Sequence, residues 1–269
     1  MLYEYTYPGG KAGCITFSYD DGRDFDRRLV DIFNRYGIKG SFHLNSANLG
    51  CPGYVTAGEL PELYAGHEVS LHCLTHPFPS RIPSHRQLSE LTADKAALEA
   101  AWGHIISSMS FPFGDYNDHF LKCMDASGVL YGRTTRATRK FSWPEDFRVW
   151  DPTCHHNDDL LSLLAGFRRY STGFKGMALF YIWGHSYEFN DAGNWDMIES
   201  FCKEAGSDPD TWYATGLEIY DYITSLRRLR ISADGCIVVN PSALTLWGRD
   251  ERGALLQILP GENRFSPCV

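Results

Sequence analysis

Strand-like runs alternate with helical patterns along most of this 269-residue chain. The runs are short, apolar and rich in β-branched or aromatic residues, whereas the segments between them carry apolar residues at helical spacing. The predicted strands are residues 13–18, 39–44, 68–71, 105–110, 130–133, 176–183 and 211–215. The predicted helices are residues 25–36, 57–64, 84–102, 117–126, 158–170, 195–205 and 217–228. About seven successive βα units predict an α/β fold with a parallel sheet, which we expect to close into a barrel.

The rhythm of the sequence changes after residue 228. Asp234-Gly235 is a hairpin signal between two of the later β runs. Those runs are residues 230–233, 236–240, 244–247 and 255–258. We therefore predict a barrel over residues 1–228 and a small C-terminal antiparallel β appendage over residues 229–269, packed on the same domain. No interior stretch is rich enough in Pro, Gly or Ser to link separate domains.

Charge and hydropathy exclude several classes of protein. The net charge is −8 and no long block of Lys or Arg occurs, which argues against a protein that binds nucleic-acid phosphates. No apolar run reaches about 18 residues, so no membrane span is predicted. The first residues have no basic start and no apolar segment, so we predict no signal peptide and a cytoplasmic location. The many aromatic residues either pack in the core or contact the faces of sugar rings from the surface, and composition does not distinguish the two roles.

Eight cysteines are scattered along the chain without a Cys-x-x-Cys pair. The chain is large and several cysteines fall inside predicted strands, so we expect reduced, buried thiols. The eight are Cys14, Cys51, Cys73, Cys123, Cys154, Cys202, Cys236 and Cys268.

Two adjacent carboxylates, Asp20 and Asp21, follow the first apolar run and precede Gly22. Two like charges at the end of a buried strand repel each other. A fold tolerates them when a cation neutralises one of them or when one is kept as a base. The plain alternative is a strand-ending turn that caps the next helix.

Paired imidazoles, His72 and His76, follow the third predicted strand. Groups that follow parallel strands converge on one face of a βα barrel, so we expect these histidines to meet the Asp pair. Zinc accepts two His nitrogens and one carboxylate, keeps a position for water and makes that water acidic. The remaining carboxylate can take the proton of the water, and His185, after the sixth strand, is the candidate acid for the leaving group. A polar loop before Pro77 is the plain alternative for the two histidines.

Four segments resemble motifs of the polysaccharide deacetylase family, also called the NodB-homology or carbohydrate esterase family 4 domain. Residues 16–22 resemble its Thr-Phe-Asp-Asp-Gly motif, and residues 72–76 its His-(Ser/Thr)-x-x-His motif with Cys73 at the second position. Residues 110–114 resemble its Arg-x-Pro-Tyr-Gly motif, and residues 180–185 its late Leu-x-His motif. The four segments occur in the family's order.

The resemblance implies a fold, a reaction and residue roles. Family members fold as a distorted barrel of seven or eight βα units, and they hydrolyse N-acetyl and sometimes O-acetyl groups on sugar polymers. Asp20 would be the general base. Asp21, His72 and His76 would hold one divalent metal ion, with Zn²⁺ expected and Co²⁺, Mn²⁺ or Ni²⁺ as alternatives. The backbone amide of Phe113 would help to form the oxyanion hole.

The family's late motifs imply an acid and its partner. His185 would be the general acid, and a carboxylate would hydrogen-bond its imidazole. Asp151, in the segment Trp150-Asp151-Pro152, is the expected carboxylate. A core histidine satisfied by the backbone is the plain alternative for His185.

Three departures from the family pattern affect the expected site. Ser18-Tyr19 adds residues before the Asp pair, which can change which carboxylate faces the metal. Ser110 stands where the family has an Arg that orients the base, and Arg133 or Arg136 could replace that Arg. Arg133 is also a candidate substrate contact.

The third departure is the segment Cys154-His155-His156, which has no equivalent in the family. His155 and His156 belong to a surface loop, contact the substrate or act as further ligands.

These observations predict a metal-dependent hydrolase that cleaves a carbon–nitrogen bond outside peptides and removes acetyl, most readily N-acetyl, from a carbohydrate. One alternative is a hydrolase of the same fold that acts on a small amide or an O-acetyl ester. The other is a catalytically silent carbohydrate-binding domain, for which the missing Arg at position 110 is the main support. The expected partners are a carbohydrate or small amide, with no nucleic acid and no membrane.

Overall fold

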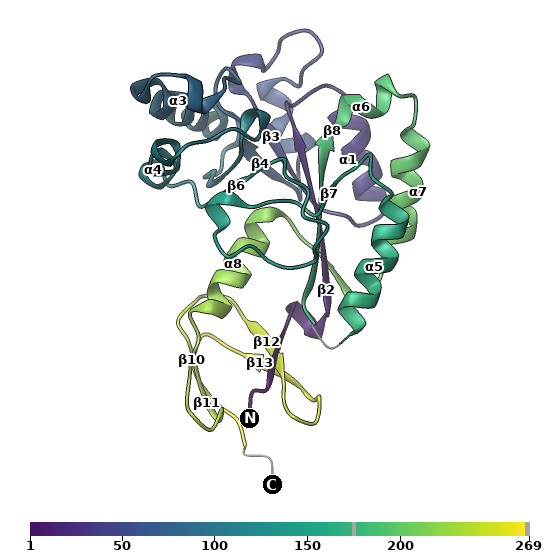
Figure 1. Ribbon diagram of the computed structural model, residues 1–269, viewed down its shortest axis with the longest axis vertical. Coiled ribbons are helices and arrows are strands. Elements are labelled where there is room, and N and C mark those ends of the chain that lie inside the picture. The colour runs from purple at the N-terminus through teal and green to yellow at the C-terminus, as the bar shows by residue number, and fades with distance from the viewer. Residues whose placement is uncertain (174–175, 267–269) are drawn as a thin grey trace.

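A curled parallel sheet forms the centre of the molecule (Figure 1) in a computed structural model that describes residues 1–173 and 176–266. Seven strands lie side by side in the order β6-β5-β4-β3-β2-β8-β7, β9 also pairs with β2, and all these pairings are parallel. The strands are β2 (Gly13–Asp20), β3 (Gly40–Leu44), β4 (Glu68–Leu71), β5 (Ser108–Ser110), β6 (Tyr131–Arg133), β7 (Cys154–His155), β8 (Ala178–His185) and β9 (Thr211–Tyr213). The predicted α/β fold is confirmed as a distorted barrel, with β6 and β7 at the two ends of the sheet.

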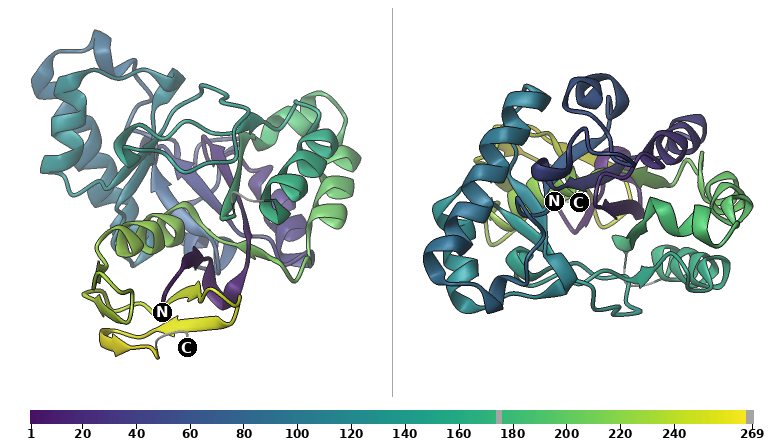
Figure 2. Two further views of the ribbon diagram at one scale, coloured as in Figure 1. Left: turned by 60° about the horizontal axis from the view of Figure 1, so that its bottom comes forward. Right: turned by 90° about the horizontal axis from the view of Figure 1, so that it is seen from above.

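Helices cover the outside of this sheet (Figure 2). They are α1 (Asp26–Arg35), α2 (Leu60–Leu63), α3 (Ser84–Trp102), α4 (Asp118–Ala126), α5 (Leu160–Thr172), α6 (Ser186–Asp191), α7 (Trp195–Ala205) and α8 (Gly216–Arg227). Short 3-10 turns occupy Pro8–Gly10, Ser46–Asn48, Ala57–Glu59, Pro79–Arg81, Pro112–Gly114 and Phe147–Val149. Figure 1 shows α3 and α4 on one side of the sheet and α1, α5 and α7 on the other. α8 begins with a capping box between Thr215 and Glu218, which satisfies backbone N–H groups of its first turn.

Buried aromatic rings join the sheet to the elements that cover it. The ring of Phe17 on β2 lies 4.7 Å from that of Phe33 on α1, and Phe42 on β3 lies 4.7 Å from Tyr64 after α2. All four side chains are fully buried. Full burial of one Phe contributes about 1.5–3 kcal/mol, so these contacts fix the positions of β2 and β3 and of the residues at their carboxyl ends.

The C-terminal region forms two small antiparallel sheets, ordered β1-β12-β13 and β10-β11-β14. Their strands are β1 (Glu4–Thr6), β10 (Arg230–Ile231), β11 (Ile237–Asn240), β12 (Leu246–Arg249), β13 (Leu255–Ile258) and β14 (Gly261–Arg264). The antiparallel appendage is thus confirmed, and the N-terminal strand β1 forms part of it. The Oη of Tyr222 on α8 donates to the carbonyl of Thr6 at 2.7 Å, which ties the appendage to the barrel. The division of the chain at residue 228 stays a prediction.

Four short elements were not predicted from the sequence: β1, β7, β14 and α6. Each strand has two to four residues and pairs with a strand distant in sequence, so no local pattern marks it. Among the described residues, no helix is both long and apolar enough to cross a membrane. The cytoplasmic location stays a prediction, and the prediction for Cys268 lies outside the described residues.

Candidate active site

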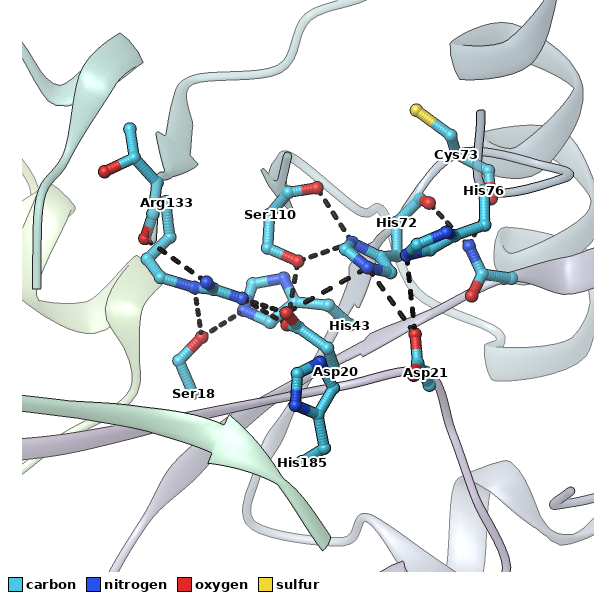
Figure 3. A network of polar contacts seen from close by, with 12 residues as sticks. Ser18, Asp20, Asp21, His43, His72, Cys73, His76, Ser110, Arg133 and His185 are labelled. Carbon is cyan, nitrogen blue, oxygen red and sulfur yellow. Dashed lines mark hydrogen bonds and ion pairs between the residues drawn. The ribbon is translucent and has the colours of Figure 1, made fainter. Parts of the chain in front are cut away.

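Many of the polar residues singled out from the sequence lie at the carboxyl ends of the sheet strands. Figure 3 shows six of them together: Asp20, Asp21, His72, His76, Arg133 and His185. Parallel strands end at one edge of a sheet, so residues from distant segments gather there. Those at or next to strand ends are Asp20 and Asp21 (β2), His72 (β4), Ser110 (β5), Arg133 (β6), His155 (β7) and His185 (β8). In Figure 3, His72 and His76 face Asp21 while Arg133 approaches Asp20 from the opposite side.

Asp21, His72 and His76 have the spacing of a metal-binding triad. Oδ1 of Asp21 lies 3.6 Å from Nε2 of His72 and 3.7 Å from Nε2 of His76. Atoms at these separations are too far apart for direct hydrogen bonds, but each can lie about 2.0–2.1 Å from one shared ion. The three ligand atoms all lie within 4.8 Å of one another. The residues therefore fit a divalent cation.

Ser110 sets the tautomer of His72. The Ser110 hydroxyl donates to Oδ1 of Asp20 at 2.9 Å, so towards Nδ1 of His72, 2.7 Å away, it acts as an acceptor. The same Nδ1 lies 3.0 Å from the Ser110 carbonyl oxygen, also an acceptor. Nδ1 of His72 therefore carries the proton and Nε2 presents a lone pair towards Asp21. A lone pair facing a carboxylate is repulsive without a cation, and a backbone acceptor behind a metal-binding histidine is the usual outer-shell arrangement.

The loop that carries the two histidines is held from α3 and β3. Oδ2 of Asp94 accepts from the backbone N–H of His72 at 3.2 Å, and Oε2 of Glu90 accepts from that of Thr75 at 2.8 Å. The amide of Asn45 donates to the carbonyl of His72 at 2.5 Å. Burial raises the pKa of Asp94 to about 7, although its hydrogen bonds to Ser46 and His72 act in the opposite direction. Polar groups inside the protein therefore fix this loop.

Backbone strain concentrates at the site. Four of the seven non-glycine residues with positive φ in residues 1–173 and 176–266 are Asp21 (79°), Cys73 (61°), His76 (55°) and Phe113 (59°). Side chains with a Cβ adopt this region at a cost of about 1–3 kcal/mol, and such residues cluster at functional sites. This backbone turns the Asp21 and His76 side chains towards one another, a feature that residue type alone did not predict.

Asp20 has a different partner from its neighbour. Both carboxylate oxygens of Asp20 accept from Nη2 of Arg133. Burial acts to raise the pKa of Asp20, but the charged guanidinium of Arg133, the largest opposing cause, holds it well below its usual range. Asp20 is therefore ionised at neutral pH. The sequence offered Arg133 and Arg136 as candidates for the cation beside Asp20, and the structure has Arg133 there.

Arg133 is itself fully buried, which argues against the predicted substrate contact. Its Nε donates to Oγ of Ser18 at 3.1 Å, and that oxygen lies 2.7 Å from Nε2 of His43. The guanidinium also lies 4.5 Å from the ring centroid of Trp183. These contacts with Ser18 and Trp183 fix the Arg133 side chain, and its charge pairs with Asp20 and not with solvent.

The prediction that Asp151 partners His185 is wrong. Asp151 accepts from Nε of Arg136 at 2.8 Å and from the Thr134 hydroxyl. His185 instead places Nδ1 3.1 Å from Oε1 of Glu188, one turn later on α6. Helix α6 starts directly after β8, so a residue three positions after His185 lies one turn on and can contact its ring.

Glu188 is surrounded by imidazoles. Its Oε2 lies 3.2 Å from Nε2 of His155 and 2.9 Å from Nε2 of His156. Burial lowers the pKa of His185, but the hydrogen bond that its ring donates to Glu188 and the charges of Asp20 and Asp21 outweigh this effect, so the pKa is raised overall. His185 therefore retains a proton more readily than a free histidine.

His155 and His156 differ in exposure. The His155 side chain is 23% exposed, whereas His156 is fully buried between the rings of Tyr19 and Phe189. His156 is therefore neither part of a surface loop nor open to a substrate. A Cβ added at Gly184 would lie 2.0 Å from the His156 ring, so the glycine is needed to seat this ring.

The motif around Phe113 forms the rim of the site. The Phe113 ring is 53% exposed, stacks on Phe78 with centroids 3.8 Å apart, and meets the edge of the His76 ring at 4.5 Å. Gly114 has a φ of 69°, and a Cβ there would lie 2.3 Å from the Thr135 hydroxyl. The Phe113 ring therefore lies beside His76, and the oxyanion-hole role of the Phe113 backbone amide stays a prediction.

Sequence reasoning missed Glu188, Glu90, Asp94 and the hydrogen-bonding role of Ser110. A signal existed for Glu188, because it follows His185 by three residues at a strand-to-helix junction. Glu90 and Asp94 are buried acids at i and i+4 on α3. The sequence of α3 contains many other polar residues, so these two could not be recognised as buried.

Comparisons with known proteins point to one family for the first half of the chain. Residues 8–132 match the family model described as polysaccharide deacetylase. The Bacillus subtilis protein "Putative polysaccharide deacetylase YxkH" is 25% identical over 138 residues, which are 50% of this chain and 48% of that protein. The Arthroderma benhamiae protein "Probable peptidoglycan-N-acetylglucosamine deacetylase" is 26% identical over 114 residues, 42% of this chain and 26% of that one. The chain thus spans half or less of the length of these two relatives.

Solved structures share the fold. A Mycobacterium smegmatis protein with the same family description matches with a TM-score of 0.59 at 16% identity, over 84% of this chain and 96% of that one. A carbohydrate esterase family 4 pseudoenzyme from Bacillus anthracis matches with a TM-score of 0.50 at 18% identity, over 81% and 68%. The family match over residues 8–132, together with the shared fold, supports a polysaccharide deacetylase domain of the NodB-homology type, carbohydrate esterase family 4, in this part of the chain.

Proposed function

We propose that the protein is a metal-dependent hydrolase that removes acetyl groups, most readily N-acetyl groups, from a carbohydrate. One observation carries the proposal: the two adjacent carboxylates have separate partners. Asp21 faces His72 and His76, whereas Asp20 is paired with Arg133. A site of this kind needs one carboxylate to bind a cation and another to remain available as a base.

Asp21, His72 and His76 would hold the ion, and two imidazoles with one carboxylate suit Zn²⁺. When bound, a divalent ion supplies Lewis-acid polarisation of the acetyl carbonyl and makes water more acidic. The other steps belong to the chain itself. Asp20 takes a proton from the attacking water, and the backbone N–H of Phe113 donates to the developing oxyanion.

His185 completes the reaction as the acid. Its Nδ1 faces Glu188, which leaves Nε2 to donate a proton to the departing amine. The strand pairing places His185 of β8 opposite Asp20 of β2, so base and acid lie beside each other at one strand edge. Addition of water across the amide then yields acetate and the free amine.

The catalytically silent binding domain loses its main support. That alternative rested on the missing Arg at position 110, and Arg133 pairs with Asp20 from the next strand. A hydrolase of a small amide or O-acetyl ester uses the same groups, so substrate tests must distinguish it from a carbohydrate deacetylase.

Replacing the base tests the proposal. Acetate release would be measured for the metal-reconstituted protein and the Asp20→Asn variant on N-acetylated oligosaccharides, O-acetylated sugars and cyclic amides. We expect Asp20→Asn to retain its metal and lose turnover by about 10²–10⁴-fold, the usual contribution of a general base. Unchanged turnover in the variant would contradict the role of Asp20 as the base. Wild-type activity on cyclic amides alone would contradict the proposal that the substrate is a carbohydrate.

A further inference from the structure

We infer that His155, His185 and Glu188 form a second divalent-cation site, weaker than the first, whose occupation inhibits the enzyme. The cation class is that of Zn²⁺ and Co²⁺, because the donors are again two imidazoles and one carboxylate. The consequence for activity rests on the proposed function of His185, whereas the binding itself does not.

The geometry resembles that of the first triad. One ligand atom from each of the three residues lies within 4.8 Å of the other two. Oε1 of Glu188 lies 3.1 Å from Nδ1 of His185, and Oε2 lies 3.2 Å from Nε2 of His155. These separations allow one ion to contact both imidazoles and the carboxylate with about 2.0–2.2 Å bonds.

The three side chains are held yet accessible. They extend from the ends of β7 and β8 and from the first turn of α6, three elements that meet at one edge of the sheet. Their side chains are 23%, 20% and 25% exposed, for His155, His185 and Glu188 respectively. An ion can therefore reach them from solvent without unfolding the site.

Buried polar groups behind the cluster point to a ligand that the protein does not itself supply. Neither ring nitrogen of the fully buried His156 has a hydrogen bond of ordinary geometry among the described residues, and the same holds for Oε2 of Glu188. Nε2 of His156 lies 2.9 Å from that oxygen. Buried polar atoms are normally satisfied, and an imidazole behind a carboxylate is a common outer-shell contact of a metal ligand.

The surrounding charge also favours a cation. Asp20 and Asp21 act on His185 in addition to Glu188, so three carboxylates surround its imidazole. Arg133 neutralises Asp20, and the ion of the first site would neutralise Asp21. Glu188 is left with imidazoles as its only near partners among the described residues, and these bind a metal ion when neutral.

The two sites differ in how well their histidines are prepared. His72 has Nδ1 facing acceptors and a free lone pair on Nε2, as ligation requires. His155 has the reverse arrangement, because its Nδ1 accepts from the backbone N–H of Asn157 at 3.2 Å, which places the proton on Nε2. Ligation through Nε2 must move this proton and break that contact. We therefore expect the first site to fill before the second.

Occupation of the second site would tie the acid imidazole to a metal. His185 would use Nδ1 as a ligand and could no longer act as a freely titrating acid towards the leaving amine. Turnover should therefore rise with the first equivalent of Zn²⁺ and fall at higher concentrations.

The experiment is a metal titration of the full chain after removal of bound ions with a chelator and dialysis. Zn²⁺ and Co²⁺ binding would be followed by calorimetry, by elemental analysis and by the visible absorption of bound Co²⁺. The variants are His155→Gln for the second site, Asp21→Asn for the first, and His104→Gln as a control at an exposed histidine elsewhere. Acetate release would be measured across the same concentrations, relative to each protein's own turnover at one equivalent.

We expect two ions per wild-type chain with dissociation constants at least tenfold apart. His155→Gln should bind one ion tightly and show no inhibition at high Zn²⁺, Asp21→Asn should lose the tight ion, and His104→Gln should behave as wild type. One ion per wild-type chain at saturation, or two ions in His155→Gln, would overturn the inference. Two ions in a wild-type chain that releases no acetate from any substrate would support the second site and contradict the proposed function.

Discussion

The site has two halves that are built differently. In the metal half, Asp21, His72 and His76 follow β2 and β4, and the imidazole of His72 is oriented by backbone and hydroxyl acceptors of Ser110. In the acid half, His155 and His185 end β7 and β8, and Glu188 lies three residues after His185. The ring nitrogens of the imidazoles contact the Glu188 carboxylate. In the first arrangement the lone pair on Nε2 of His72 faces Asp21, whereas in the second the N–H of His155 faces Glu188.

The difference shows how the protein can separate two tasks that use the same residue types. Two histidines and a carboxylate occur in both halves, so composition does not assign their roles. The atom that faces each ring nitrogen decides whether the imidazole is a ligand or an acid. The metal half lies within the residues matched by the family model, whereas Arg133 and the acid half lie beyond residue 132.

The largest expected effect comes from Arg133, which pairs with Asp20. Arg133→Ala would leave the buried carboxylate of Asp20 without its partner, and removal of one member of a buried ion pair typically costs about 3–5 kcal/mol. Denaturant unfolding would measure this loss of stability.

Arg136→Ala is the matched control, because Arg136 is exposed and pairs with Asp151 at the surface. It should change the free energy of unfolding very little. Equal effects of the two substitutions would show that Arg133 does not hold Asp20 in the way described.

A smaller effect is expected from Asp26, a buried acid on α1. It accepts hydrogen bonds from Ser186, beside His185, and from Tyr64 at 2.7 Å. Burial raises the pKa of Asp26 to about 7, although both hydrogen bonds oppose the rise. The folded state then binds the proton more tightly than the unfolded state, so this contribution to stability is complete below about pH 4 and is lost as pH rises to 7.

Asp26→Asn removes this titration. Between pH 5 and 8, wild type should lose on the order of 2 kcal/mol relative to the variant, as measured by denaturant unfolding of the metal-free protein. Asp31→Asn, at an exposed position of the same helix, is the control and should parallel wild type. Parallel stability curves for wild type and Asp26→Asn would contradict the raised pKa of Asp26.

Glu188 tests the acid half directly. Glu188→Gln keeps the shape of the side chain and removes the charge that favours a protonated His185, so turnover should fall by about 10–100-fold. The descending limb of the pH–rate profile should also move to lower pH, because the pKa of His185 is no longer raised by Glu188.

Asp151→Asn is the matched control for the partner predicted from the sequence. Asp151 contacts Thr134 and Arg136, so this substitution should leave the pH–rate profile unchanged. A shift in the profile of Asp151→Asn, with none in that of Glu188→Gln, would reverse the assignment.

The smallest effect is expected at the rim. The Phe78 and Phe113 rings are stacked and Phe113 is half exposed, so they offer an apolar surface to the face of a sugar ring. Phe78→Ala should raise KM for an N-acetylated oligosaccharide by about two- to tenfold, with little change in kcat, since uniform binding affects KM alone. A fall in kcat with unchanged KM would place Phe78 in the chemistry.

The metal half could be predicted from the sequence because its residues follow strands directly. An apolar run that ends in Asp20-Asp21, and an imidazole pair after another strand, are local signals that barrel topology brings together. The partner of His185 was predicted wrongly as Asp151, and Glu188 was not considered. The choice depends on α6, a six-residue helix that the sequence pattern did not reveal.

Backbone strain and the pairing of residues distant in sequence also could not be predicted from the sequence. The positive φ of Asp21, His76 and Phe113 could not be located from the sequence, because most Asp and His residues, although enriched in this region, and nearly all Phe residues have negative φ. The partnership of Arg133 with Asp20 joins residues 113 positions apart, and only the parallel sheet brings them together. Position 110 showed that a cation was missing, but the sequence left two arginines as candidates.

Metal content and acetate release, measured together on one preparation, test the central claim most directly. The protein would be stripped by chelation and reloaded with Zn²⁺ in steps up to one equivalent, with an N-acetylated oligosaccharide as substrate. We predict background turnover in the stripped protein and recovery in proportion to bound metal, with no recovery in Asp21→Asn. Full turnover by a chain shown to hold no metal would contradict the account.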